Sequence, residues 1–158
     1  MEIMDRNVIL EWPEIGVKVS YSLMSEQEPV LCEILWNNIA SPLKMACRHT
    51  LSTGEMFCGG ERPPRNRVNT GTQATPLGRV KIKPNQIEPG CITYSVHGGY
   101  GGLSVWYGGS TETLFAPGCV IGKVETSQLG ELIKAGKYVW DAQYLTHRLA
   151  IMYASRGK

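Results

Sequence analysis

A predicted hairpin brings together two residue types that can transfer a proton. Two short strand patterns, residues 44–51 and 55–59, flank a loop in which Gly54 can take the left-handed conformation of a three-residue turn. In this register His49 and Glu55 are diagonal neighbours across the two strands, with Cα atoms roughly 7 Å apart. A carboxylate beside an imidazole raises its basicity. We therefore predict His49 and Glu55 as catalytic acid–base groups that act on a small-molecule substrate.

Two alternatives to this pair remain open from the sequence. His49 can be a partly exposed strand residue and Glu55 a solvated carboxylate beside the turn, and a loop that differs by one residue would put them on opposite faces. Cys47 and Cys58 lie near His49, but their spacing matches no recognised zinc pattern, and Cys58 is expected to point away. We expect neither a metal nor a cofactor.

Three arginines are candidates for binding a substrate carboxylate. The segment 61–76 has no apolar period, and loops of such length are usually functional or disordered. Within it, Arg62, Arg65 and Arg67 carry planar guanidinium groups that suit a carboxylate. The alternative is an ordinary solvated loop.

The glycine-rich segment 97–109 is not a phosphate-binding loop, because it lacks the required glycine spacing and lies between two strands. Its glycines instead favour a tight turn that lets backbone approach a ligand. Tyr94, Trp106 and Tyr107 are predicted to form an aromatic wall of the pocket. Alternation puts Trp106 and Tyr107 on opposite faces, so at least one of these aromatic residues belongs to the core.

Glu112 is a second candidate acid for substrate binding. The alternative is that Glu112 is an ordinary surface loop residue.

Short alternating segments separated by Gly and Pro predict a mainly β fold. The expected strands cover residues 15–23, 44–51, 55–59, 79–82, 92–96, 103–107, 119–125 and 147–154. Seven or eight strands suffice to close a barrel without an exposed edge, and two helices could cover its mouths.

The two helices are predicted from different signals. Ser25 and Glu28 form a capping box ahead of a helix over residues 26–39. A second helix follows Ser127, and Gly136 either caps it or lies within it. The last segment, 147–154, is compatible with helix or strand; a closing strand with Leu149, Ile151 and Tyr153 on one face is favoured.

Length and composition predict one domain over residues 1–158. Sixteen basic and fourteen acidic residues are scattered along the chain, so a nucleic-acid partner is not expected.

No segment is long and apolar enough to span a membrane, and the start resembles no targeting signal, so a cytoplasmic location is expected. Five widely spaced cysteines favour free thiols in a reducing compartment. Homo-oligomer formation is left open.

The order of these elements resembles a family of small bacterial proteins with a cyclophilin-like β-barrel. The resemblance extends from about residue 15 to residue 153 and includes the closing strand and helix. Its most specific features are LWNNIA at 35–40, His49 with Thr53-Gly54-Glu55, the Pro89-Gly90 turn and the strand end Tyr107-Gly108.

The resemblance implies a closed barrel and three hypotheses about function. Relatives include subunits of allophanate and 5-oxoproline hydrolases, which imply acid–base chemistry on an amide or cyclic amide that bears a carboxylate. The amino-terminal domain of cucumopine and mikimopine synthases implies condensation of an amino acid with a keto acid, although this chain has no room for their carboxy-terminal helical domain. The third hypothesis is a non-catalytic ligand-binding subunit of an amidohydrolase complex. Prolyl isomerase activity is not expected, because the Phe-His-Arg signature is missing.

Overall fold

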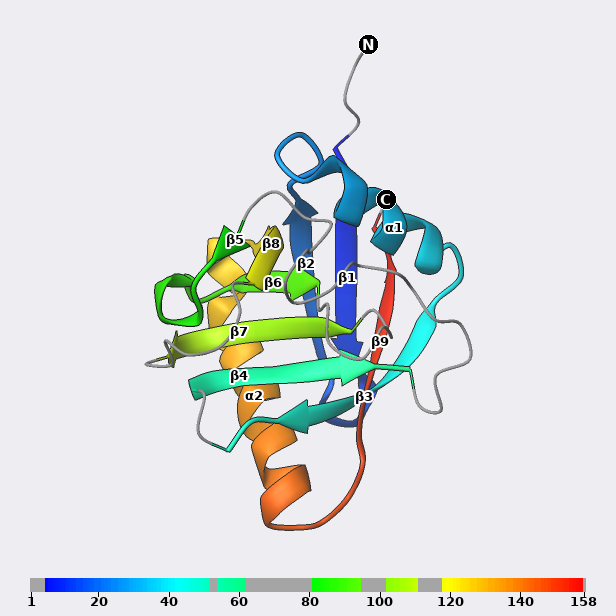
Figure 1. Cartoon of the computed structure of the whole chain (residues 1–158). Coiled ribbons are helices and arrows are strands. Elements are labelled where there is room, and N and C mark those ends of the chain that lie inside the picture. Colours follow the sequence, from blue (N-terminus) through cyan, green and yellow to red (C-terminus); the bar gives the residue numbers. More distant parts are fainter. Residues whose placement is uncertain (1–4, 52–53, 62–80, 95–101, 111–117, 158) are drawn as a thin grey trace.

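A computed structural model describes residues 5–51, 54–61, 81–94, 102–110 and 118–157 (Figure 1). Within these ranges eight strands form a closed antiparallel barrel in the order β2-β1-β9-β3-β4-β7-β6-β8, and β8 pairs back with β2. The short β5 pairs with the start of β8. The strands are β1 (Asn7–Trp12), β2 (Val17–Leu23), β3 (Leu43–His49), β4 (Gly54–Gly60), β5 (Lys81–Ile82), β6 (Cys91–Tyr94), β7 (Leu103–Ser110), β8 (Gly118–Val124) and β9 (Ala150–Arg156). The helices are α1 (Pro29–Asn38) and α2 (Leu129–Tyr144). The predicted mainly β barrel with two helices is confirmed.

One large apolar cluster fills the barrel. In β2 the residues Val17, Val19 and Tyr21 are buried and alternate with residues that are more exposed, as the period of a strand with one buried face requires. The helix α2 packs its apolar face against β2, β3, β4, β7 and β9. No helix in the described ranges is long and apolar enough to cross a bilayer.

A second, smaller apolar cluster includes Met56 and Trp106, which are opposite one another in the β4–β7 pairing. Their strand neighbours Phe57 and Val105 belong to the main cluster instead. Successive side chains of a strand point to opposite faces, so the second cluster lies on the other side of the sheet. Ile87, which follows a short 3-10 turn (Pro84–Gln86), also belongs to this second cluster.

The amino-terminal elements differ in part from the prediction. The strand β1 was not expected, and Ile15 ends a 3-10 turn, Pro13–Ile15, instead of starting β2. The helix α1 begins at Pro29, and Glu28 makes no side-chain capping hydrogen bond, so the predicted capping box is wrong. The physical reason is that a proline disfavours helical backbone in the residue before it, while proline itself suits the first helical position.

The carboxy-terminal segment is the strand β9, as favoured from the sequence, and Gly136 lies inside α2. The main core, however, contains the alternate set Ala150, Met152 and Ala154. Leu149 precedes the strand and is 64% exposed. The set predicted to share one face therefore does not supply the core residues of this strand.

Met152 provides a test of this register, because its side chain is fully buried and lies against Gly59. We expect Met152→Ala to lower the free energy of unfolding by about 2–5 kcal/mol, because it leaves a cavity in the core. The control Leu149→Ala should change it by less than about 0.5 kcal/mol. Urea denaturation followed by circular dichroism measures both, and equal losses for the two variants would contradict the register.

Candidate functional site

His49 lies at the end of β3 among aromatic side chains from three elements. Its ring makes edge contacts with Tyr107 of β7 and Trp140 of α2, with centroids 5.7 and 5.0 Å away, and a tilted contact with Phe57 of β4 at 6.5 Å. Trp140 also packs on Tyr144, one turn further along α2. Only 6% of His49 is exposed. A titratable group therefore lies in a largely apolar setting.

The backbone of His49 is held by α2 rather than by a strand. The pairing of β3 with β9 ends at Cys47, so the backbone N–H and C=O groups of His49 have no partner in β9. The amide of His49 donates to Oε1 of Gln143 at 2.6 Å, and its carbonyl accepts from the Tyr144 hydroxyl at 3.2 Å. Because buried backbone groups need partners, these two side chains fix the end of β3 against the helix.

The hydrogen bonds of the His49 ring determine its tautomer. Nδ1 lies 2.7 Å from the Thr50 carbonyl oxygen, which can only accept, so Nδ1 carries the proton. Nε2 lies 2.5 Å from the Tyr107 hydroxyl. In the neutral ring Nε2 must then accept the hydroxyl proton of Tyr107. Tyr107 is thus the donor and His49 the acceptor of this hydrogen bond, and we call the two side chains the His49–Tyr107 pair.

Burial sets the proton affinities of this pair. It lowers the pKa of His49 below its ordinary value of 6.5, although the Thr50 carbonyl and the negative charge of Glu55 partly oppose this shift. Burial, together with Glu55, raises the pKa of Tyr107 to about 12. Both groups are therefore neutral near pH 7, and Nε2 of His49 is free to accept a proton through Tyr107.

Glu55 lies in β4 where the pairing with β7 is irregular, between Gly54 and Met56. It is exposed, and its side chain covers Gly108: a Cβ atom at position 108 would lie only 2.5 Å from Oε1 of Glu55. Gly108 is thus required for this placement. The carboxylate is open to solvent while its charge acts on both members of the buried pair. An exposed base next to a buried proton relay is an arrangement suited to acid–base chemistry.

Tyr107 is placed by a second glycine. The ring of Tyr107 lies so close to Gly136 of α2 that any Cβ atom there would overlap three of its ring carbons. Glycine inside a helix lowers helix stability by about 1 kcal/mol relative to alanine. At position 136 this loss accompanies the close contact between the helix backbone and the Tyr107 ring. The contact fixes the ring whose hydroxyl reaches His49.

The structure places the predicted site residues in several locations. The hairpin register is confirmed, with His49 opposite Phe57, and His49, Glu55 and Tyr107 are brought together. Tyr94 is buried elsewhere, and its hydroxyl lies 3.5 Å from Nδ2 of Asn38 in α1. Trp106 lies in the second apolar cluster and donates to Thr93 at 3.3 Å. Four predicted residues lie outside the described ranges: Arg62, Arg65, Arg67 and Glu112.

The residues that sequence reasoning missed come from α2. Trp140, Gln143 and Tyr144 have the i, i+3, i+4 spacing that puts side chains on one helical face. This spacing marks a shared face, but nothing in the sequence links that face to His49. Among the described residues no group of three or more His, Cys, Asp or Glu side chains could hold a metal ion.

No protein-family model matches the chain, and no curated protein matches its sequence. Solved structures do match. McbB, determined in complex with tryptophan, superposes with a TM-score of 0.77 at 25% identity over 94% of this chain and 44% of that chain. This chain therefore spans less than half the length of McbB. The hypothetical protein AF2241 from Archaeoglobus fulgidus matches with a TM-score of 0.57 at 11% identity over 97% of this chain and 95% of that chain, and it supports the fold alone.

The lowered pKa of His49 predicts how stability depends on pH. Between the pKa in the folded protein and the ordinary value of 6.5, the unfolded chain binds more protons than the folded one. The free energy of unfolding should therefore fall as the pH drops through 6.5, down to the pKa of the folded state. His49→Gln should remove this part of the slope, whereas the exposed control His147→Gln should retain it. Urea denaturation from about pH 8 to about pH 5 measures the slope, and an unchanged slope in His49→Gln would contradict the assignment.

Two glycines of α2 give a matched pair of variants. Gly136→Ala should destabilise the protein by about 1–3 kcal/mol, because the new methyl group displaces Tyr107. In the same helix a Cβ at Gly130 meets nothing within 4 Å, so Gly130→Ala should stabilise by up to about 1 kcal/mol. Thermal unfolding measures both variants. In a Tyr107→Ala background the penalty at position 136 should disappear, and a persistent penalty would argue against this contact.

Proposed function

We propose that the protein is an enzyme that binds a free amino acid at the barrel end beside His49 and catalyses its condensation with a carbonyl compound such as a keto acid. The observation that carries the proposal is the hydrogen-bonded His49–Tyr107 pair next to the exposed carboxylate of Glu55. The similarity to McbB, whose structure contains tryptophan, supports an amino acid as the ligand. McbB is more than twice as long as the matched region, so its own activity is not transferred.

The two parts of the site have different roles in this reaction. An amine adds to a carbonyl carbon, and the adduct then loses water to give a carbon–nitrogen double bond. Glu55, which is exposed, takes the proton that the attacking ammonium group must lose and returns it to the departing hydroxyl. The first adduct carries a positive charge on nitrogen and a negative charge on the former carbonyl oxygen. Tyr107 takes the surplus proton of that nitrogen on its own oxygen while it passes its hydroxyl proton to Nε2 of His49, and the reverse transfer then protonates the oxygen of the adduct to give the hydroxyl that leaves as water.

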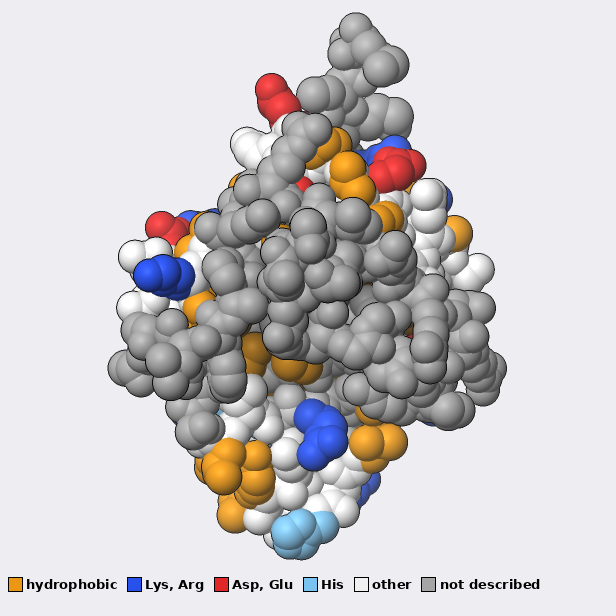
Figure 2. Space-filling view, in the orientation of Figure 1, with side chains coloured by type: hydrophobic (Ala, Val, Ile, Leu, Met, Phe, Trp, Pro, Cys, Tyr) orange, Lys and Arg blue, Asp and Glu red, His pale blue; other side chains and the backbone are white. Residues whose placement is uncertain are grey.

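His49 can hold that proton only briefly. The imidazolium form keeps its Nδ1–H bond to Thr50 and is favoured by the charge of Glu55, yet burial disfavours it. The pair therefore accepts a proton and returns it within a catalytic cycle. Exposed apolar side chains next to the ends of β3 and α2 could contact a substrate side chain: Leu51, which follows β3, is 74% exposed, and Leu145, which follows α2, is 67% exposed. Figure 2 shows hydrophobic side chains exposed at the lower left of the molecule.

The hydrolysis of amides or cyclic amides expected from the resemblance stays a prediction, and the same groups would serve it. Hydrolysis needs an attacking water that a base deprotonates and a leaving nitrogen that an acid protonates. The condensation is preferred because the comparison supplies an amino acid and no amide. The predicted substrate-binding arginines, Arg62, Arg65 and Arg67, would in either case neutralise a carboxylate.

The test has a binding step and a turnover step. A thermal-shift screen with amino acids, keto acids and cyclic amides should show stabilisation by at least one amino acid, because a ligand that binds only the folded state raises its apparent stability. Mass spectrometry of mixtures of that amino acid with keto acids should then detect a product equal to the sum of the two less one water.

Variants connect the product to the site. Glu55→Gln and Tyr107→Phe should each lower kcat by about 10²–10⁴-fold, while the exposed control Glu26→Gln should retain the wild-type rate. Amino-acid binding without turnover against every carbonyl compound would favour the non-catalytic alternative. Turnover of a cyclic amide in the absence of any amino acid would favour hydrolysis. Full activity in both site variants would refute the assignment of the site.

A further inference from the structure

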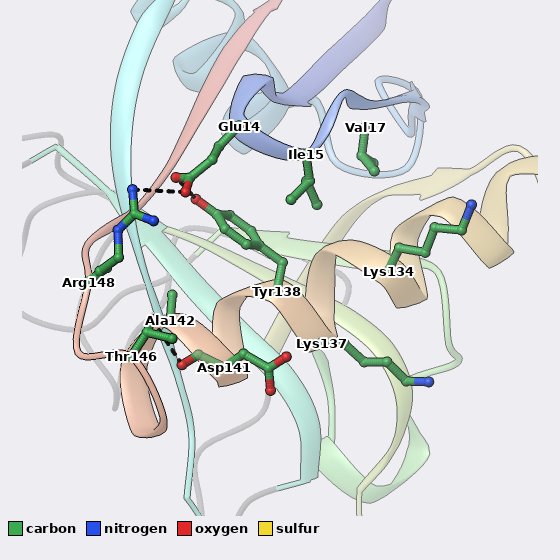
Figure 3. Close-up of a pocket in the computed structure, with 10 residues that line it drawn as sticks. All are labelled: Glu14, Ile15, Val17, Lys134, Lys137, Tyr138, Asp141, Ala142, Thr146 and Arg148. Atoms are coloured by element: carbon green, nitrogen blue, oxygen red, sulfur yellow. Dashed lines mark hydrogen bonds and ion pairs between the residues drawn. The ribbon is translucent and has the colours of Figure 1, made fainter.

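A concave surface lies on a flank of α2 that does not include the residues in contact with His49. A groove of about 510 Å³ runs between the turn Pro13–Ile15, the helix α2 and the residues that precede β9 (Figure 3). Its volume is typical of small-molecule sites, which range over about 300–1,000 Å³. The lining residues are Glu14, Ile15, Val17, Lys134, Lys137, Tyr138, Asp141, Ala142, Thr146 and Arg148.

One end of the groove is fixed by a polar cluster. The Glu14 carboxylate accepts a hydrogen bond from the Tyr138 hydroxyl at 2.7 Å and pairs with Nη2 of Arg148 at 3.0 Å (Figure 3). The three side chains come from the amino-terminal turn, from α2 and from the segment before β9. The cluster therefore ties the walls of the groove together, and the charges of Glu14 and Arg148 compensate one another.

The middle of the groove is apolar. Ile15, Val17, Ala142 and the ring of Tyr138 line it, and Ile15 is 38% exposed. An apolar group bound here would remove this exposed surface from water, which favours binding. The shape and chemistry suit a flat or branched apolar side chain.

Two opposite charges border the apolar middle. Lys137 and Asp141 are exposed, lie one turn apart on α2, and form no ion pair with each other in the described structure. Asp141 is closer to the carboxy-terminal end of the helix, where the helix dipole also favours a cation. Lys134, one turn earlier, adds positive charge at the other end, because its exposed pair with Glu131 is weak.

We propose that this groove is a second binding site, for a free α-amino acid with a large apolar side chain. The carboxylate of the ligand pairs with Lys137, its ammonium group pairs with Asp141, and its side chain covers Ile15 and Tyr138. The site is distinct from the barrel end, because His49 contacts α2 through Trp140, Gln143 and Tyr144. It does not depend on the proposed condensation.

The experiment uses tryptophan and two analogues, each of which lacks one charge. Two-dimensional NMR of the whole chain should show tryptophan-dependent shifts of the amides of Ile15, Lys137 and Tyr138, in addition to any shifts near His49. Indole-3-propionate has no ammonium group and tryptamine has no carboxylate, so each should bind at these amides about three- to tenfold more weakly than tryptophan. Equal affinity of all three compounds would overturn recognition of a zwitterion.

Charge variants then assign the contacts. Lys137→Ala should weaken tryptophan and indole-3-propionate about three- to tenfold and leave tryptamine unchanged. Asp141→Asn should weaken tryptophan and tryptamine and leave indole-3-propionate unchanged. The matched controls Lys83→Ala and Asp5→Asn, at exposed positions elsewhere, should behave as wild type. An absence of tryptophan-dependent shifts at Ile15, Lys137 and Tyr138 would reject the groove even if the amides around His49 respond.

Discussion

The pairing of β2 with β8 is the constraint on which the rest of the molecule depends. It joins Tyr21 to Val124 across most of the chain and turns an open sheet into a closed barrel. Closure leaves no strand edge among the eight and makes one interior, which apolar side chains fill. Because apolar side chains of the described residues fill this interior, a strand end where polar groups can meet solvent is the place that best suits acid–base chemistry.

His49 occupies such a place. The last residues of β3 extend beyond their pairing with β9, and α2 takes over as the partner of the backbone. A buried imidazole is costly unless its nitrogens are bonded, and here Thr50 and Tyr107 satisfy both. The same contacts that stabilise the strand end also define the tautomer, so local stability and proton transfer depend on one set of hydrogen bonds.

Local patterns were enough to predict most of the fold and only part of the site. Alternation identified β2, and the short loop before Glu55 gave the correct register for His49. Sequence neighbours cannot reveal that Tyr107 and α2 meet His49, because those contacts join segments that are distant in the chain. The start of α1 was misplaced for a local reason: the effect of Pro29 on the preceding residue outweighs the capping box.

The position of β9 determines the order in which the barrel can form. β9 lies between β1 and β3, both of which precede it in the chain. Until it arrives, β1 and β3 each present an unpaired edge, and the apolar faces of both strands lack their neighbour. Before β9 is synthesised, the other seven barrel strands can pair only as an open sheet with β1 and β3 at its two edges, and the barrel closes when β9 is inserted between them.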